Sequence, residues 1–368
     1  MAGLIVQEWI SPHGGSEKVV EAMLSAFPAA KLLTLWNDAP DKYAATDVQE
    51  SWLAKTPLRR SKAAALPFMP YTWRHLKPRD SVEWLLVSSH LFAHQARACS
   101  PYSDVEKYVY VHTPARYIWT PELDARGQGP IPALASSVLR PLDRKRASEL
   151  RHVAANSAFV RQRIRDTWGI DAEVIYPPVN VDPIEAKEEW GAELTPGEAQ
   201  ILRSLPRPFI LGASRFVRYK RLDAVIRIGA AAGLPVVIAG SGPDEATLRA
   251  MADSAGVPVT FIPSPGDNLL YALYQSAYAF VFPPVEDFGI MPVEAMATGT
   301  PVLVNHVGGA SESVLHGKTG MHIDPDDLDS AVKALECVSG MDRETVAARA
   351  RTFSTDVFQQ KLHAWMER

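Results

Sequence analysis

Two acidic residues eight positions apart, Glu286 and Glu294, bracket a Phe-Gly-Ile stretch that follows a run of buried-type apolar residues. Pro292 predicts a helix that begins there, because proline is favoured in the first helical turn. Backbone amides just ahead of such a start point outward and can hold an anion or hydroxyl groups. Those amides belong to Gly289, Ile290 and Met291. The segment indicates a binding site, although Glu294 taken alone is equally explained as a charge that stabilises the helix start.

Arg215 and Lys220 form a second candidate group, two long cations five positions apart on a predicted loop between a strand and a helix. The planar guanidinium of arginine and the compact ammonium of lysine together suit a diphosphate. Arg218 and Arg221 add positive potential nearby. We expect these two to lie on a solvated face, because most charged side chains do.

Two glycine-containing loops follow other predicted strands of the same half of the chain. Gly240 and Gly242 resemble a dinucleotide-binding loop, but no third glycine follows at the spacing of that motif. Gly308 and Gly309 precede a short predicted helix, with Glu312 behind them. A tight turn explains both pairs at least as well as ligand contact, so both interpretations stay open.

The first half of the chain holds two more candidates. Gly14 and Gly15 lie between a predicted strand and a helix, where backbone amides can approach a phosphate closely. His112 lies at the carboxyl end of a buried-type strand and is followed by a proline turn. A lone histidine is more often structural than catalytic, but a place at a strand end facing a cleft favours a function.

The loops that carry these residues need a scaffold, and the hydrophobic pattern predicts alternating strands and helices. Strands are expected at 4–9, 31–36, 84–89, 108–113, 152–157, 172–177, 209–214, 235–240, 259–263, 279–283 and 301–305. Helices in the first half are expected at 17–26, 134–150 and 158–168. The units share no repeated sequence, so the pattern predicts an α/β protein with doubly wound parallel sheets rather than a solenoid.

A chain of 368 residues is long enough for two domains. We expect two Rossmann-like domains, at 1–185 and 186–352, and an amphipathic helix at 353–368 that can cross back to the first domain. Two such domains facing each other leave a central cleft, where ligands tend to bind.

Composition excludes several classes of protein. The chain is 47% apolar and 22% charged, with only two cysteines, which is typical of a soluble globular protein and argues against a disulfide scaffold. No uncharged apolar run reaches about 18 residues, and the N-terminal segment resembles a strand rather than a signal peptide. We expect a cytoplasmic protein, and the isoelectric point of about 6.2 argues against a nucleic-acid partner.

The ordered set of motifs resembles the GT4 family of GT-B glycosyltransferases. Arg-x4-Lys, Glu-x7-Glu and Gly-Gly-x2-Glu follow one another as in that family, and the resemblance covers nearly the whole chain. It implies a GT-B fold, two Rossmann-like domains facing each other across a cleft, of which 1–185 binds the acceptor and 186–352 binds the nucleotide sugar. It also implies transfer of a sugar with retention and no cofactor or metal. The segments EDFGIMPVEAMATGTPV, YKRLD and VHTPARYIW look most like bacterial mannosyltransferases of polysaccharide assembly that use GDP-mannose.

The resemblance also implies roles. Arg215 and Lys220 would hold the donor diphosphate, Glu286 the transferred sugar, and Glu294 the nucleotide ribose, while His112 would contact the sugar. The implied catalytic set is Glu286, His112, Arg215 and Lys220. The implied donor-binding set is Gly14, Gly15, Arg215, Lys220, Gly240, Phe288, Gly289, Ile290, Met291 and Glu294.

Residues 55–79 suggest a further contact, because they hold seven Lys or Arg, no acid and several aromatics. Basic and aromatic residues together are typical of attachment to an anionic membrane surface. That location would suit the lipid-linked or saccharide acceptor that the resemblance implies, and the basic segment 140–151 could extend the surface. The prolines of this segment forbid one continuous amphipathic helix, so simple packing on the first domain is the alternative.

Three rival functions remain for the same architecture. The first is a UDP-sugar-dependent transferase that acts on a small molecule. The second is a sugar-nucleotide epimerase, which would need acid and base groups but no acceptor. The third is a scaffold protein without activity, which the intact set of cations and carboxylates disfavours.

Overall fold

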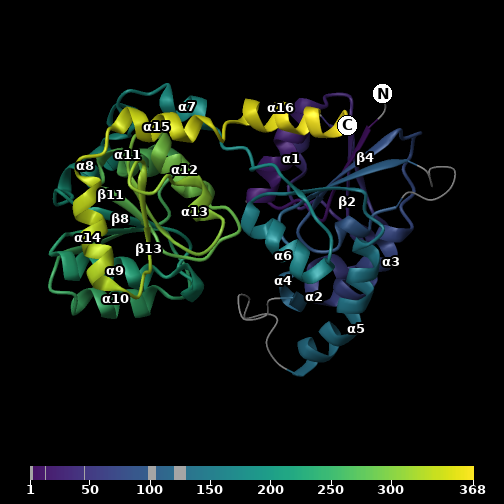
Figure 1. Ribbon diagram of the computed structural model, residues 1–368, viewed down its shortest axis with the longest axis horizontal. Coiled ribbons are helices and arrows are strands. Elements are labelled where there is room, and N and C mark those ends of the chain that lie inside the picture. The colour runs from purple at the N-terminus through teal and green to yellow at the C-terminus, as the bar shows by residue number, and fades with distance from the viewer. Residues whose placement is uncertain (1–2, 13, 45, 98–104, 120–129) are drawn as a thin grey trace. The chain divides into compact units, whose positions relative to one another are not determined.

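The structure is a computed structural model that describes residues 3–12, 14–44, 46–97, 105–119 and 130–368. The chain forms two compact units (Figure 1). Unit 1 contains Met1–Pro178 and Asp356–Arg368, and unit 2 contains Val179–Thr355. The division therefore falls at residue 178, a few residues before the boundary expected at residue 185.

Unit 1 is built on a parallel sheet of seven strands. They are β1 (Gly3–Gln7), β2 (Lys31–Thr34), β3 (Val48–Glu50), β4 (Trp84–Ser89), β5 (Glu106–Val111), β6 (His152–Ala155) and β7 (Glu173–Val174). Their order is β3-β2-β1-β4-β5-β6-β7, so the direction of winding reverses between β1 and β4. The central strands are buried on both faces, and for that reason they read as unbroken apolar runs in the sequence.

Seven α-helices of the described residues belong to unit 1. They are α1 (Gly15–Ala26), α2 (Lys62–Ala65), α3 (Met69–Arg74), α4 (Arg116–Trp119), α5 (Pro130–Ala147), α6 (Ala158–Trp168) and α16 (Thr355–Met366). Figure 1 shows α16, in yellow, beside α1. Its apolar side chains Phe358, Leu362 and Trp365 are buried in the same core cluster as residues of α1. The C-terminal helix therefore completes the core of unit 1, although unit 2 precedes it in the chain.

Unit 2 repeats the plan with a parallel sheet of six strands. They are β8 (Ile210–Ala213), β9 (Val236–Ala239), β10 (Val259–Ile262), β11 (Ala279–Phe282), β12 (Val302–Asn305) and β13 (Gly320–Ile323). Their order is β10-β9-β8-β11-β12-β13, which reverses between β8 and β11. Both units thus have the strand order of a doubly wound Rossmann-like fold.

Helices join the strands of unit 2. They are α7 (Val181–Glu185), α8 (Pro196–Ser204), α9 (Leu222–Ala232), α10 (Glu245–Asp253), α11 (Asp267–Ser276), α12 (Ile290–Ala297), α13 (Ala310–Ser313), α14 (Leu328–Val338) and α15 (Arg343–Arg351). The segment 181–208, which leads from unit 1 to β8, contributes α7 and α8. Trp190 anchors it, because this side chain is buried and its indole donates to the Ile184 carbonyl oxygen at 3.1 Å.

Every predicted strand has a counterpart in the structure, and two further strands at sheet edges, β3 and β13, were not predicted. Both are only partly buried, which weakens the apolar pattern. The strand expected at 172–177 is reduced to the two residues of β7, because a Pro-Pro pair at 177–178 follows it and cannot donate to a ladder.

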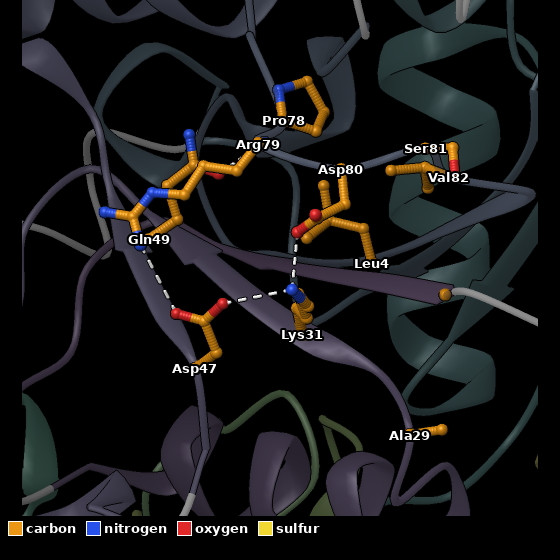
Figure 2. A pocket seen from close by; sticks show the side chains of 11 residues that line it. Leu4, Ala29, Lys31, Asp47, Gln49, Pro78, Arg79, Asp80, Ser81 and Val82 are labelled. Carbon is orange, nitrogen blue, oxygen red and sulfur yellow. Dashed lines mark hydrogen bonds and ion pairs between the residues drawn. The ribbon is translucent and has the colours of Figure 1, made fainter.

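The amino-terminal edge of the sheet in unit 1 carries a chain of exposed ion pairs. Figure 2 shows Lys31 between Asp47 and Asp80, with Arg79 beside Asp47. The hollow there measures about 40 Å³, far less than the several hundred Å³ of a typical ligand pocket. The predicted site residues of unit 2 follow its strands, at the opposite, carboxyl edge of the sheet.

Within the ranges that the structure describes, no helix is long and apolar enough to cross a membrane.

Candidate active site

The two predicted groups of unit 2 lie on loops that leave adjacent strands. Arg215 follows β8 and Glu286 follows β11, and these strands pair directly at the point where the strand order reverses. In open α/β sheets, ligands bind at the carboxyl ends of the strands at such a switch point. The topology therefore brings together two groups that the sequence separates widely.

Lys220 and Glu286 are in direct contact. The Nζ atom of Lys220 lies 2.5 Å from Oε1 of Glu286, across 66 positions of sequence. The two side chains are 14% and 15% exposed. Because both charges are largely withdrawn from water, their attraction is screened much less than that of a pair on the open surface.

The remaining cations of the loop have different surroundings. Arg215 is exposed, and its Nη2 donates to the Tyr219 hydroxyl at 2.9 Å. Arg221 instead forms ion pairs with Asp326 and Asp223. A hydrogen bond from Arg221 lowers the pKa of Asp326 to about 2, with help from a neighbouring arginine. Arg221 is thus engaged in an ion-pair network, and Arg218 is exposed as expected.

Helix α12 begins at Ile290, two residues ahead of the start predicted at Pro292. Gly289 is the N-cap with φ of 92°, a left-handed conformation that glycine adopts without strain. The sharp turn at Gly289 lets the helix start early, and Pro292 then falls inside the first turn, where its missing N–H costs nothing. The amides of Ile290 and Met291 thus belong to the first turn.

Glu294 lies one turn further along α12 and is buried, with 7% of its surface exposed. Two effects raise the pKa of Tyr274 in α11. The larger is the burial of the hydroxyl, and the carboxylate of Glu294 raises the pKa further. Glu294 therefore lies just past the first turn of α12, close to the position predicted from the sequence. Glu286 and Glu294 consequently differ in burial and in neighbours.

The glycine pair at 308–309 packs against the loop that carries Glu286. The amide of Gly309 donates to the Glu286 carbonyl oxygen at 2.7 Å. A Cβ atom on Gly309 would lie 1.9 Å from the Asp287 carbonyl oxygen, and one on Gly308 would lie 2.9 Å from that of Glu286. Close backbone approach, rather than a turn alone, accounts for these two glycines.

Gly240 and Gly242 likewise permit close backbone approach, here between the loop after β9 and the loop after β8. A Cβ atom on Gly240 would lie 1.9 Å from the Ser214 carbonyl oxygen, and one on Gly242 would lie 2.5 Å from that of Phe216. Both glycines also have positive φ. They allow the loop after β9 to pack on the backbone around Arg215, so packing explains them whether or not Gly240 also touches a ligand.

In unit 1, Gly14 and Gly15 form the start of α1, with Gly14 at the N-cap. A carboxylate already lies beside them: Oε2 of Glu17 is 2.0 Å from where a Cβ atom on Gly14 would be. Oε1 of Glu17 accepts a hydrogen bond from the Ser11 amide at 3.0 Å. The carboxylate of Glu17 therefore already lies at the start of α1, and contact of Gly14 and Gly15 with a phosphate stays a prediction.

His112 follows β5 at the carboxyl edge of the same sheet. Its Nε2 lies 2.8 Å from the Ser88 hydroxyl at the end of β4, which orients the imidazole. The ring is half-buried and lies at 6.3 Å, centroid to centroid, from that of His90. His112 is thus one of two histidines at this edge.

Sequence reasoning missed the second histidine and its partner Glu8. Glu8 is fully buried directly after β1, and its Oε1 accepts the amides of Leu91 and Ala93 at 2.8 and 2.9 Å. Nδ1 of His90 lies 3.2 Å from Oε2 of Glu8. An acid directly after an apolar strand was the available signal, but the separation of 82 positions in the sequence hid the pairing.

Two family models match the chain, one for each unit. "Glycosyltransferase Family 4" matches residues 13–183, and "Glycosyl transferases group 1" matches residues 198–350. The chain belongs to the GT4 family. This agrees with the resemblance in the motifs.

Curated relatives of this GT4 chain include several mannosyltransferases. The GDP-mannose-dependent alpha-(1-6)-phosphatidylinositol monomannoside mannosyltransferase of Mycobacterium tuberculosis is 32% identical over 49% of this chain and 50% of its own. The O-antigen chain mannosyltransferase RfbU of Salmonella typhimurium is 31% identical over 50% of this chain and 51% of its own. D-inositol 3-phosphate glycosyltransferase of Mycolicibacterium paratuberculosis is 32% identical over 50% and 44%. The chain spans about half the length of the curated relatives it matches.

Solved structures match over the full length. HepE from Anabaena in complex with UDP is 16% identical, with a TM-score of 0.67 over 100% of both chains. Sucrose-phosphate synthase from Thermosynechococcus elongatus is 17% identical, with a TM-score of 0.69 over 99% of this chain and 98% of its own. These similarities establish that the GT4 chain has the GT-B fold, with two Rossmann-like domains.

Proposed function

We propose that this GT4 chain is a retaining hexosyltransferase that moves mannose from GDP-mannose to a saccharide or lipid-linked acceptor. The contact between Lys220 and Glu286 at the switch point of unit 2 carries the proposal, because it joins a cation suited to a diphosphate with a carboxylate suited to sugar hydroxyls. The names of two relatives support mannose as the transferred sugar.

The donor is proposed to lie along the carboxyl edge of the sheet in unit 2. Arg215 and Lys220 hold the diphosphate, and Glu286 binds the sugar near its anomeric carbon. The amides of the first turn of α12 fix the same sugar, and Glu294 accepts hydrogen bonds from the ribose. In unit 1, Gly15 and His112 are proposed to keep the roles that the family resemblance implies for them.

The proposed reaction needs no enzymatic nucleophile. The bond between the anomeric carbon and the diphosphate oxygen breaks, and an acceptor oxygen bonds the same carbon from the same face. The departing phosphate oxygen takes the proton of the acceptor hydroxyl. Arg215 and Lys220 offset the negative charge that grows on the leaving group, which is why we propose that no metal ion is required.

The acceptor is proposed to be presented at a membrane surface. Residues 55–79 form several short helices in place of one amphipathic helix, as the prolines of this segment require. Phe68 and Tyr71 are 44% and 63% exposed, and Lys55 and Arg60 are exposed nearby in the sequence. Exposed aromatics beside cations suit an anionic bilayer, and a phosphatidylinositol mannoside is the acceptor named for one relative.

A thermal-shift panel of GDP, UDP and ADP with their sugars tests the donor. We expect GDP and GDP-mannose to raise the melting temperature, because a ligand that binds only the folded state stabilises it. A response to UDP instead would redirect the proposal to a UDP-sugar donor. Incubation of GDP-mannose without acceptor should leave the sugar unchanged, whereas an epimerase would convert it. The anomeric configuration of the transferred sugar, read by NMR, tests retention.

A further inference from the structure

The ammonium of Lys220 can bind either of two anions, the carboxylate of Glu286 or a diphosphate. In the structure it pairs with the carboxylate of Glu286 at 2.5 Å, and in the proposed function it holds a diphosphate. A nucleotide that engages Lys220 must therefore compete with Glu286 for the same charge.

Both members of the pair are held in place by their backbones. Glu286 lies on the loop that Gly309 braces through the hydrogen bond to its carbonyl oxygen. Lys220 ends a 3₁₀ turn in which its amide donates to the Val217 carbonyl oxygen at 2.9 Å. Since the two loops leave adjacent strands, the contact is a consequence of the fold rather than a chance meeting of flexible side chains.

Neither Arg215 nor Arg221 is paired with Glu286 in the structure. Arg221 is engaged with Asp326 and Asp223, and Arg215 donates to the Tyr219 hydroxyl. Glu286 and a diphosphate therefore compete for the ammonium of Lys220.

The degree of burial makes separation of the pair costly unless both charges gain new partners. With side chains 14% and 15% exposed, neither charge recovers full hydration when the contact opens. A nucleotide sugar supplies both replacements, phosphate oxygens for Lys220 and sugar hydroxyls for Glu286. A nucleoside diphosphate supplies only the first, and leaves the Glu286 carboxylate without a partner beside an anion.

We propose that Glu286 is a specificity-determining residue that selects the sugar-bearing donor over the sugar-free nucleoside diphosphate, which is the product. This inference rests on the proposed function. Once the sugar has been transferred, Glu286 pairs with Lys220 again, and the affinity for the nucleoside diphosphate product falls. The same carboxylate thus binds the sugar before transfer and promotes product release after it.

The test is the ratio of the dissociation constants for GDP and GDP-mannose, measured by calorimetry for the wild type and for Glu286→Gln. The amide cannot neutralise Lys220 but keeps the shape of the side chain. We expect GDP to bind about tenfold more tightly to Glu286→Gln, as for the loss of a close competing charge, while the affinity for GDP-mannose changes by less than about threefold because lost hydroxyl contacts offset the freed ammonium. Glu286→Ala should move the ratio in the same direction.

Glu245→Gln is the matched control, since it removes one acid of the same unit from an exposed pair with Arg249. It should leave the ratio unchanged, and melting curves establish that each variant is folded. If the panel identifies another base, UDP and UDP-glucose replace the guanosine pair.

An unchanged ratio in both Glu286 variants overturns the inference and leaves the proposed function standing. Equal tightening of both ligands also overturns it, since that result indicates simple repulsion of phosphate without selection. If the wild type binds no nucleoside diphosphate or nucleotide sugar at all, the proposed function itself fails, and the inference fails with it.

Discussion

The amide of Gly309 donates to the carbonyl oxygen of Glu286 at 2.7 Å, and no room exists for a side chain at this glycine. Position 309 therefore sets how closely α13 approaches the loop of the site. Gly309→Ala would place a methyl group 1.9 Å from the Asp287 backbone oxygen. Because backbone cannot yield like a side chain, the loop must shift, which we expect to cost about 1–3 kcal/mol of unfolding free energy.

Transfer by Gly309→Ala should fall at least about tenfold, because displacement of about 1 Å disturbs a reacting geometry strongly. Rates of sugar transfer and denaturation curves measure the two effects. Gly340→Ala is the control, since a Cβ atom there meets nothing within 4 Å. Normal transfer by Gly309→Ala would show that the glycine does not position the loop.

Glu286→Ala and Lys220→Ala should damage different steps. Loss of the carboxylate should reduce kcat by about 10²–10³, as for removal of one preorganised polar group, with little change in donor affinity. Loss of the ammonium should weaken nucleoside diphosphate binding by about tenfold or more. Lys187→Ala, which removes a cation from an exposed pair with Glu193, should change neither quantity. Near-normal turnover by Glu286→Ala would refute the assignment of the sugar site.

Asp143 contacts residues of three other segments of unit 1. We therefore expect its ionisation to change the free energy of unfolding as the pH is lowered. Its Oδ2 accepts the indole N–H groups of Trp119 and Trp168, each at 2.8 Å, and Oδ1 lies 3.1 Å from Nε2 of His94. Burial alone raises the pKa of Asp143, but attraction to His94 and these hydrogen bonds outweigh burial and lower it below 3.8.

The folded chain therefore binds this proton less tightly than the unfolded chain, so the carboxylate stabilises the fold above the unfolded pKa. That contribution is lost as the pH falls through the lowered folded value. Asp143→Asn should lose about 2–3 kcal/mol at pH 7, and its difference from wild type should shrink below pH 3.8. Denaturation followed by tryptophan fluorescence measures both. Asp166→Asn on the exposed face of α6 is the control, and a difference independent of pH would contradict the prediction.

Helix α16 should stabilise unit 1 through its buried aromatic residues. Phe358 is 1% exposed and Trp365 is 4% exposed. Either change to alanine leaves a cavity and should cost about 3–5 kcal/mol. Gln360→Ala is the control, because Gln360 lies on the exposed face of α16 and its replacement tests helix propensity alone. It should leave the free energy of unfolding nearly unchanged. Equal stability of all three variants would mean that the helix contributes little to the core.

Phe68 and Tyr71 should contribute to binding of an anionic membrane surface. The double change Phe68→Ser with Tyr71→Ser removes two exposed aromatics, and should reduce binding to phosphatidylglycerol-containing vesicles at least about fivefold. Vesicle flotation measures the bound fraction, which should also fall with added salt. Ile201→Ser, an exposed apolar residue of unit 2, is the control. Failure of the wild type to bind these vesicles would end the membrane proposal.

Local pattern in the chain was enough to predict the alternation of strands and helices, the α/β class and the residues of Arg-x4-Lys and Glu-x7-Glu. These features are local, because a buried parallel strand must be apolar over its whole length and a helix must repeat its apolar residues every three to four positions. The start of α12 was misplaced, because Gly289 rather than Pro292 decides where the chain turns.

The tertiary structure decided which of these residues meet. Contact between Lys220 and Glu286 depends on β8 pairing with β11, and contact between Glu8 and His90 depends on β1 pairing with β4. Strand order is a long-range property that no short motif encodes, so both pairs were invisible in the sequence. The tertiary structure likewise explains why positions 240 and 309 are glycine, because the backbone of a second loop packs closely against each of them.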